Sequence, residues 1–384
     1  MDARTGLPVV GMVGGGQLAR MTHQAAIALG QSLRVLAVSP DDGAALVAAD
    51  VRIGGHTDLA ALRDFAKGCD VVTFDHEHVP GEHIRTLAAE GVNLLPGADA
   101  LRYAQDKRAM RERLTELGAP VPRWRALPSG GADREQVLAE FGRSVGWPLV
   151  AKATRGGYDG RGVWFAGSPA DVPDGVELIL EERVPLRREL AALVARSPFG
   201  QVAAYPVVET VQRDGICVEV LAPAPGISEE QAVAVQRLAI DLATALDVVG
   251  LLAVELFERR DGALVVNELA MRPHNSGHWT IEGARTSQFE QHLRAVLDYP
   301  LGDTSLAAPT VVMANLLGGE PGGMPLDERL HHCLAAQPGA RVHLYGKLPR
   351  PGRKIGHVTL LGADIVDLRR RAAEAVRWLR DGTE

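Results

Sequence analysis

Cysteine is scarce in this sequence, and its placement argues against a disulfide scaffold and against a cysteine-based metal centre. The 384 residues contain three cysteines, Cys69, Cys217 and Cys333, which lie far apart and show no metal-ligand spacing. Small secreted folds that depend on disulfides carry cysteine at a much higher density. The three side chains are therefore expected to be reduced thiols, as in cytosolic proteins.

The sequence also lacks an excess of positive charge and any long apolar run. Its formal net charge is −7 and its pI is about 6.0, which argues against nucleic acid or an anionic membrane as partner, although local basic pockets stay open. The stretch MDARTGLPVVGM has no basic region before an apolar core, and no apolar run reaches membrane-spanning length. A cytoplasmic protein that binds neither nucleic acid nor membrane is expected.

Apolar residues are present in the proportion that a folded protein of two or three domains needs. Hydrophobic residues make up 46% of the chain and charged residues 23%, as in ordinary globular proteins. The length exceeds that of one small domain. In the first hundred residues, the apolar runs at 8–13, 33–40 and 69–74 are typical of strands, and we expect a small parallel α/β domain there.

Two polar stretches follow strands of this first domain. Glycines 14 to 16 separate the first strand from a helical pattern, so that free N–H groups and the helix dipole point at an anion. The spacing is not a full G-x-G-x-x-G, so a phosphate of another ligand is favoured over a dinucleotide. The third strand ends in DHEH at 75–78, either at the ligand-binding edge of the sheet or in a solvated loop.

The stretch VAKATRGGYDGRGVWF at 150–165 combines a strand, a lysine and a glycine-rich loop. Glycines 156, 157, 160 and 162 allow positive φ and a close approach of backbone N–H groups to a phosphate, which Lys152 would also bind. A hairpin turn is the structural alternative. However, a turn has no need of Tyr158, Asp159 and Arg161 between the glycines.

Residues 106–117 are typical of a charged helix that ends at Gly118. The segment from there to about Leu180 is expected to form an antiparallel lid. Lys107 on this helix is by itself an ordinary solvated charge, and becomes interesting if a second lysine is needed near Lys152. The strand 178–184 carries Glu181 and Glu182, and Glu189 follows. A carboxylate there could accept the hydroxyls of a ribose, although exposed glutamates usually only face solvent.

Asp261 and Gly262 separate two apolar runs, which is a strong signal for a β-hairpin. With these two residues as the loop, Arg260 pairs with Ala263, and Glu255 lies opposite Glu268. Two facing carboxylates repel each other unless a cation lies between them, and oxygen ligands beside a phosphate loop suit Mg²⁺. The alternative is a register that differs by one residue, or glutamates that face water.

Polar and basic residues gather in two further places. Arg272, His274, Asn275, Ser276 and His278 crowd the end of the second hairpin strand, more oxyanion-binding groups than a plain loop needs. A basic cluster near the C-terminus is either a solvated loop or a clamp on a substrate phosphate; its members are Lys347, Arg350, Arg353 and Lys354.

Four motifs together resemble the N5-carboxyaminoimidazole ribonucleotide synthase family of the ATP-grasp superfamily. They are GGGQLARM at 14–21, GGYDGRG at 156–162, NELAMRPHNSGH at 267–278 and RPGRKIGHVTL at 350–360. The last two are the specific ones, and the resemblance spans nearly the whole chain. It implies an α/β ATP-grasp fold with a Rossmann-like parallel domain at 1–100, a linker helix and lid at 101–184, and a C-terminal antiparallel-sheet domain at 185–384.

The resemblance implies ATP and Mg²⁺ as cofactors, with Mn²⁺ as a substitute, and a homodimer. It places the metal on Glu255 and Glu268. Its ATP-binding positions are Lys107, Lys152, Gly157, Tyr158, Asp159, Gly160, Arg161, Gly162, Val163, Glu181, Glu182, Arg183, Val184, Glu189, Gln212, Asn267 and Glu268. Its substrate-binding positions are Gly16, Gln17, Leu18, Glu77, His274, Asn275, Ser276, Lys347 and Arg353, and its catalytic positions are Tyr158, Asp159, Arg161, Arg272 and His274.

The activity that the resemblance implies is the ATP-dependent carboxylation of aminoimidazole ribonucleotide by bicarbonate, through carboxyphosphate, in purine biosynthesis. The sequence departs from the family pattern at Gln212 (usually histidine), at Met271 (usually proline) and at FDHEH, 74–78. Two alternatives stay open. A formate-dependent glycinamide ribonucleotide transformylase would share the ATP half of the chain, and a nucleotide sensor would bind without catalysis.

Overall fold

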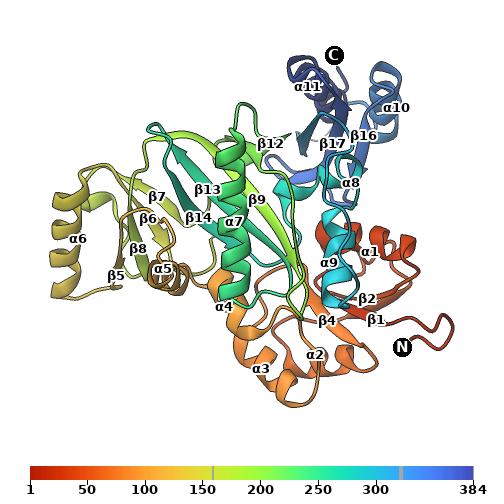
Figure 1. Cartoon of the computed structure of the whole chain (residues 1–384), viewed down its shortest axis with the longest axis horizontal. Coiled ribbons are helices and arrows are strands. Elements are labelled where there is room, and N and C mark those ends of the chain that lie inside the picture. Colours follow the sequence, from red (N-terminus) through yellow and green to blue (C-terminus); the bar gives the residue numbers. More distant parts are fainter. Residues whose placement is uncertain (158–159, 320–322, 384) are drawn as a thin grey trace.

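The computed structural model of the chain describes residues 1–157, 160–319 and 323–383. Three sheets organise it (Figure 1). The first contains the parallel strands β1 (Val9–Val13), β2 (Ser32–Ala37), β3 (Asp50–Ile53) and β4 (Val71–Phe74), in the order β3-β2-β1-β4. The parallel α/β unit expected at the N-terminus is confirmed. Its helices are α1 (Gln17–Ala28), α2 (Leu59–Ala66) and α3 (Gly81–Ala89).

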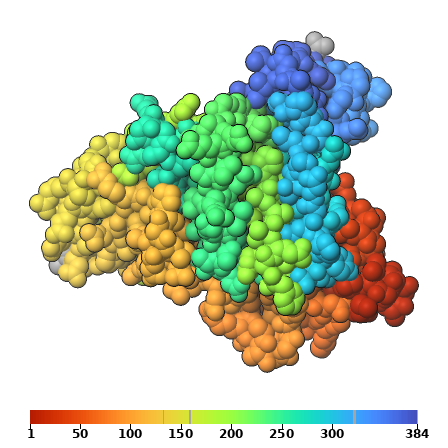
Figure 2. Space-filling view, viewed as in Figure 1, coloured from red at the N-terminus to blue at the C-terminus, as the bar shows by residue number. Residues whose placement is uncertain are grey.

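Two helices connect this unit to a lid. α4 (Ala98–Gln105) and α5 (Lys107–Glu116) precede a four-stranded antiparallel sheet in the order β5-β8-β6-β7. Its elements are β5 (Trp124–Leu127), α6 (Ala132–Val145), β6 (Leu149–Ala153), β7 (Val163–Ala166), the 3₁₀ turn η1 (Pro169–Asp171) and β8 (Leu178–Glu182). This lid projects from the rest of the molecule as a separate lobe, yellow in Figure 2.

A nine-stranded antiparallel sheet forms the body. Its order is β14-β13-β9-β11-β12-β15-β17-β16, and β10 pairs with β9. The strands are β9 (Leu186–Arg196), β10 (Val202–Ala204), β11 (Val208–Arg213), β12 (Ile216–Ala222), β13 (Gly250–Arg259), β14 (Leu264–Ala270), β15 (Thr310–Leu317), β16 (Arg341–Leu344) and β17 (Lys354–Gly362). The mixed fold with antiparallel sheets beyond the first domain is as predicted.

Helices cover this sheet, and the apolar core lies between the two layers. α7 (Glu229–Ala245) packs on β9 and β13, and α11 (Ile365–Asp381) packs on β15 and β17. The remaining elements are η2 (Asn275–Gly277), α8 (Thr280–Gly283), α9 (Gln288–Val296) and α10 (Leu326–Ala336). α9 also contacts α1, which joins the body to the N-terminal unit (Figure 1). In the described ranges, no helix is long and apolar enough to cross a bilayer.

Candidate active site

A cleft of about 1750 Å³ is lined by the loops that follow the strands of the first sheet, and by strands and loops of the other two sheets. The N-terminal unit contributes the glycine corner at 14–16 and residues 75–82, the lid contributes Lys152 and part of the glycine loop, and the body contributes β13, β14 and the segment after β14. Three regions that are distant in sequence therefore face one space. This is the arrangement that a site for several ligands requires.

Most of the predicted site residues line this cleft, and they come from all three parts of the chain. Those lining it are Gly16, Gln17, Leu18, Glu77, Lys107, Lys152, Gly157, Gly160, Val163, Glu181, Glu182, Arg183, Val184, Glu189, Gln212, Glu255, Asn267, Glu268, Arg272, His274, Asn275 and Ser276. Arg161, Gly162, Lys347 and Arg353 are not among the lining residues. Tyr158 and Asp159 lie outside the described residues.

The glycine-rich loop needs its glycines for two different reasons. Gly156, Gly160 and Gly162 have φ of +76°, +76° and +72°, a conformation that other residues avoid. At Gly157, a Cβ would lie 2.8 Å from the carbonyl oxygen of Arg161. Three of the four predicted glycine positions thus have positive φ, and the fourth permits a close approach within the loop.

Lys152 is held in the cleft by a buried ion-pair network. Its Nζ lies 2.8 Å from Glu181 and donates to Asn267 Oδ1 at 2.9 Å. Arg111 Nε donates to Glu181 at 2.7 Å, and both of these side chains are almost fully buried. Burial by itself would raise the pKa of Glu181, but the charges of Arg111 and Lys152 outweigh it and lower that pKa to about 2.

Arg111 was missed by the sequence reasoning, although a signal for it exists. It follows Lys107 by four residues on α5, and residues at this spacing lie on the same helix face. Once Lys107 is placed toward the ligand, Arg111 is directed to the same side. Its Nη2 also donates to the carbonyl oxygen of Asn267 at 2.7 Å, so it links the lid network to β14.

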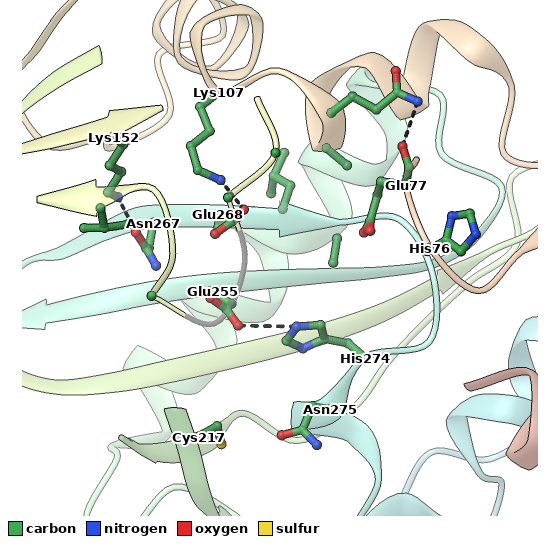
Figure 3. A pocket seen from close by; sticks show the side chains of 18 of the residues that line it. His76, Glu77, Lys107, Lys152, Cys217, Glu255, Asn267, Glu268, His274 and Asn275 are labelled. Atoms are coloured by element: carbon green, nitrogen blue, oxygen red, sulfur yellow. Dashed lines mark hydrogen bonds and ion pairs between the residues drawn. The ribbon is translucent and has the colours of Figure 1, made fainter. Parts of the chain in front are cut away.

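Lys107 points into the cleft, and its ordinary interpretation as a solvated charge is wrong. It is the first residue of α5, whose N-cap Asp106 accepts from the N–H of Ala109. The backbone N–H of Lys107 donates to Thr154 in the lid at 2.8 Å. Its Nζ lies 2.6 Å from Glu268 (Figure 3), and 12% of the side chain is exposed. Two lysines therefore reach the same cleft from different elements.

The hairpin of β13 and β14 places Glu255 opposite Glu268, as predicted, but by a different route. Arg259, rather than Arg260, bonds to Ala263, so the loop has three residues, with Gly262 at φ +86°. A bulge at Asn267 then shifts the register back by one residue. The predicted pairing of Arg260 with Ala263 is wrong, and the pairing of the glutamates is correct because the two shifts cancel.

The two glutamates point from neighbouring strands into one space, with Lys107 beside Glu268 and His274 beside Glu255 (Figure 3). Burial deep in the cleft, together with the charges of Glu268 and Glu189, raises the pKa of Glu255 to about 7. Burial likewise raises the pKa of Glu189 to about 7. This concentration of carboxylates favours a bound cation. Among the described residues no group of three acidic, histidine or cysteine side chains could hold a metal alone.

His274 faces Glu255 as a neutral imidazole. Burial, with the charges of Arg272 and Lys354, lowers its pKa to about 3. Its Nδ1 accepts from the backbone N–H of Ser276 at 3.3 Å, so the proton of the neutral ring is on Nε2. Nε2 lies 3.4 Å from Glu255 Oε1. His274 therefore presents an N–H donor to the space around the glutamates.

The N-terminal corner is built on Asp75, which is buried rather than solvated. Asp75 Oδ2 accepts from the N–H of Gly16 at 2.8 Å, and a Cβ on Gly14 would lie 1.6 Å from Asp75 Oδ1. Burial raises the pKa of Asp75 to about 6. Glu77 beyond it forms an ion pair with Arg272 at 2.8 Å. The corner is thereby tied to the segment that carries His274.

The basic cluster near the C-terminus places one lysine in the cleft and another beside it. Lys347 donates to Gln17 in the glycine corner, and Lys354 lines the cleft. The Arg353 guanidinium donates to the carbonyl oxygen of Leu348 at 3.3 Å. Of the sequence departures, Gln212 lines the cleft and lowers the pKa of Glu189 against the larger effect of burial, whereas Met271 is fully buried in the core.

Three family models match the chain. They are a ribonucleotide synthetase preATP-grasp domain at residues 7–105, an ATP-grasp domain at 112–289, and a phosphoribosylaminoimidazole carboxylase C-terminal domain at 311–371. A Mycobacterium bovis protein named N5-carboxyaminoimidazole ribonucleotide synthase is 62% identical over 384 residues, which cover 98% of this chain and 88% of that protein.

Solved structures agree. The N5-carboxyaminoimidazole ribonucleotide synthetase of Thermus thermophilus has a TM-score of 0.85 and 39% identity, covering 97% of this chain and 98% of that one. The N5-carboxyaminoimidazole synthase of Aspergillus clavatus, in complex with ADP and 5-aminoimidazole ribonucleotide, has a TM-score of 0.87 and 33% identity, covering 97% and 98%. On its cleft, its three matched domains and these similarities, the chain belongs to the N5-carboxyaminoimidazole ribonucleotide synthase family of ATP-grasp ligases.

Proposed function

We propose that this chain catalyses the ATP-dependent carboxylation of 5-aminoimidazole ribonucleotide by bicarbonate in purine biosynthesis. The products are N5-carboxyaminoimidazole ribonucleotide, ADP and phosphate. The observation that carries the proposal is that two lysines, two facing glutamates, the glycine corner and Lys354 of the basic cluster line one cleft. Family membership supports it, because the Aspergillus clavatus relative is described in complex with ADP and 5-aminoimidazole ribonucleotide.

ATP would lie between the lid and the body. Lys107 and Lys152 would contact its phosphates, the glycine loop would cover them, residues 181–184 would bind adenine, and Glu189 the ribose. The network of Arg111 and Glu181 supports this assignment, because it fixes the position of Lys152 before ATP arrives. Gln212, Asn267 and Val163 also line this part of the cleft.

Glu255 and Glu268 would hold Mg²⁺, or Mn²⁺ in its place. The two side chains suit such an ion. Burial and the neighbouring carboxylates raise the pKa of Glu255 to about 7, and a bound cation would favour the ionised form of Glu255. Two protein oxygens suffice, because Mg²⁺ takes its other ligands from water and from substrate phosphates. When bound, the ion would neutralise charge on the transferring phosphoryl group.

Chemistry would begin when a bicarbonate oxygen attacks the γ-phosphorus in line, with ADP as the leaving group, giving carboxyphosphate. In carboxyphosphate, the bond between the carboxyl carbon and the oxygen shared with phosphorus would then break, releasing CO₂ and phosphate. The exocyclic amine of the ribonucleotide would attack the CO₂ and lose a proton. Lys107 and Lys152 would stabilise the phosphoryl charge. Arg272 and His274, with Asn275 and Ser276, would bind the carboxyphosphate.

The ribonucleotide would lie at the N-terminal corner. Its phosphate would be held by Gln17 and its neighbours Gly16 and Leu18, with Lys347 and Arg353, and Glu77 is a further proposed contact. Tyr158, Asp159 and Arg161 would face the amine, and Asp159 would orient or deprotonate it. Closure of the lid would keep water from the reactive intermediate.

The wider setting is proposed in the same way. The three cysteines are free thiols, which fits a cytoplasmic protein. The proposed domains of each chain are residues 1–100, 101–184 and 185–384. The proposed assembly is a homodimer.

The test is ADP release from ATP, Mg²⁺ and bicarbonate, with and without 5-aminoimidazole ribonucleotide, for the unchanged protein and Glu268→Gln. Strong stimulation by the ribonucleotide, lost in the variant, is the expected result. Stimulation only by formate with glycinamide ribonucleotide would instead identify the chain as a formate-dependent glycinamide ribonucleotide transformylase. Absence of turnover with any of these acids would overturn the proposal.

A further inference from the structure

The segment that carries His274 has no regular secondary structure of its own beyond the single turn η2. Its position is set by the side chain of Gln288, the first residue of α9. Gln288 Oε1 accepts from the backbone N–H of His274 at 2.9 Å, and Gln288 Nε2 donates to the carbonyl oxygen of His274 at 2.7 Å. One amide thus satisfies both backbone groups of His274, in the manner of a neighbouring β-strand.

This contact is fully enclosed. Gln288 has no exposed surface, and its Nε2 also lies 3.1 Å from Nδ1 of the buried His278. Its own backbone N–H donates to Thr280 Oγ1 at 2.8 Å, and that hydroxyl donates to the carbonyl oxygen of Gly277 at 2.6 Å. The amide therefore has little freedom to move.

Gly277 completes the arrangement from the opposite side. A Cβ at this position would lie 2.4 Å from Gln288 Oε1 and 2.4 Å from Leu193 Cδ2. Only glycine leaves room for the amide to reach His274 here. The contact between Gln288 and His274 consequently explains a glycine whose φ is not in the positive range.

We infer that Gln288 is a positioning residue for the carboxylation reaction, acting through the backbone of His274. With the His274 backbone held at two points, its ring keeps Nδ1 on Ser276 and directs Nε2 toward Glu255, as Figure 3 shows for His274 and Glu255. Gln288 itself does not line the cleft, so it touches no substrate. The inference rests on the proposed function, in which His274 binds the carboxyphosphate.

The same helix provides a matched control. Gln291 is also fully buried on α9, and it also holds a backbone at two points. Its Nε2 donates to the carbonyl oxygen of Gly302 at 2.8 Å, and its Oε1 accepts from the N–H of Gly302 at 2.7 Å. That loop is not part of the cleft. Gln291→Met therefore removes equivalent bonds without touching His274.

The experiment compares the Gln288→Met and Gln291→Met variants with the unchanged protein. Thermal unfolding measures stability, and steady-state assays of the carboxylated product give kcat and the KM for ATP and for the ribonucleotide. Both variants are expected to lose stability to a similar degree. Gln288→Met alone is expected to lose about 10- to 100-fold in kcat, with both KM values within about twofold, because a displaced catalytic group lowers the rate more than binding.

The outcomes separate this inference from the proposed function. An unchanged protein that forms no carboxylated product would refute the proposed function. An active unchanged protein with equal kcat in both variants would overturn the inference about Gln288, as would a change confined to KM. If Gln288→Met is insoluble, Gln288→Glu decides by the same comparison with Gln291→Glu, because glutamate keeps the shape and the acceptor but loses the donor to His274.

Discussion

Replacing Arg111 by methionine is expected to destabilise the protein by about 3 kcal/mol, because it leaves a buried carboxylate short of a partner. Arg111 is fully buried, and the side chain of Glu181 is 3% exposed. The variant also removes the bond from Arg111 to the carbonyl oxygen of Asn267. Breaking one partner out of a buried ion pair typically costs about 3–5 kcal/mol.

The pKa of Glu181 gives a magnitude for the whole network, in which Arg111 and Lys152 both stabilise the carboxylate. It falls from the ordinary value of 4.5 to about 2, which is worth about 3 kcal/mol at roughly 1.4 kcal/mol per pKa unit. Because the folded-state pKa is the lower one, this stabilisation is present at pH values above 4.5. It is lost as the pH falls from about 4.5 toward 2. Loss of Arg111 alone should remove part of this stabilisation, because Lys152 still pairs with Glu181.

Urea unfolding at pH 7 and at several values down to pH 3 would measure both effects. Arg111→Met should lower the free energy of unfolding at pH 7. It should also make that free energy fall less steeply as the pH is lowered toward 3. Arg113→Met is the control: Arg113 forms an exposed pair with Glu116 on the same helix, worth about 0.5 kcal/mol or less. A loss below about 1 kcal/mol for Arg111→Met, with the acid dependence unchanged, would refute the reasoning.

Three further variants test other parts of the cleft. Gly14→Ala should destabilise the protein by about 1–3 kcal/mol in urea unfolding, because φ is +115° and the new Cβ would lie 1.6 Å from Asp75 Oδ1; unchanged stability would contradict the described corner. Asn315→Leu should raise the KM for bicarbonate more than that for ATP, because Asn315 and Asn275 exchange hydrogen bonds of 2.9 and 2.8 Å; equal changes would argue against a bicarbonate role for Asn275. Glu189→Gln should stabilise the ligand-free protein by about 1–3 kcal/mol at pH 8 but not at pH 4. In the folded protein the pKa of Glu189 is raised from 4.5 to about 7, so the free-energy cost of its buried charge appears as the pH rises through that range. A stabilisation by Glu189→Gln that does not depend on pH would refute this explanation.

The features that the sequence predicted correctly are local ones. The strand, glycine turn and helix at residues 9–28 follow one another directly, and so do the strand and glycine loop at 149–162. In each, the backbone requirement belongs to the residue itself, as the positive φ values of Gly14, Gly156 and Gly160 illustrate. Such requirements can be identified without knowing what packs around them.

The hairpin shows how far local reasoning extends. The Asp-Gly signal located the turn, but the loop length and the bulge at Asn267 depend on neighbours across the sheet. Val266, beside the bulge, bonds to the carbonyl oxygen of Pro120, far away in the sequence. The register around Asn267 is therefore set partly by long-range contacts, and the correct facing of Glu255 and Glu268 depended on two shifts that cancel.

By itself, the sequence determined the parallel α/β unit at the N-terminus, the hairpin that carries Glu255 and Glu268, the positions of the glycine-rich turns, and the family to which its motifs belong. Only the tertiary structure decided which of the charged residues meet. Arg111 looks like an ordinary helix-surface charge, and Gln288 like an ordinary polar residue at a helix start. Their roles arise because Glu181 and His274, distant in sequence, are brought against them. Burial then gives each charge and hydrogen bond an importance that no local pattern records.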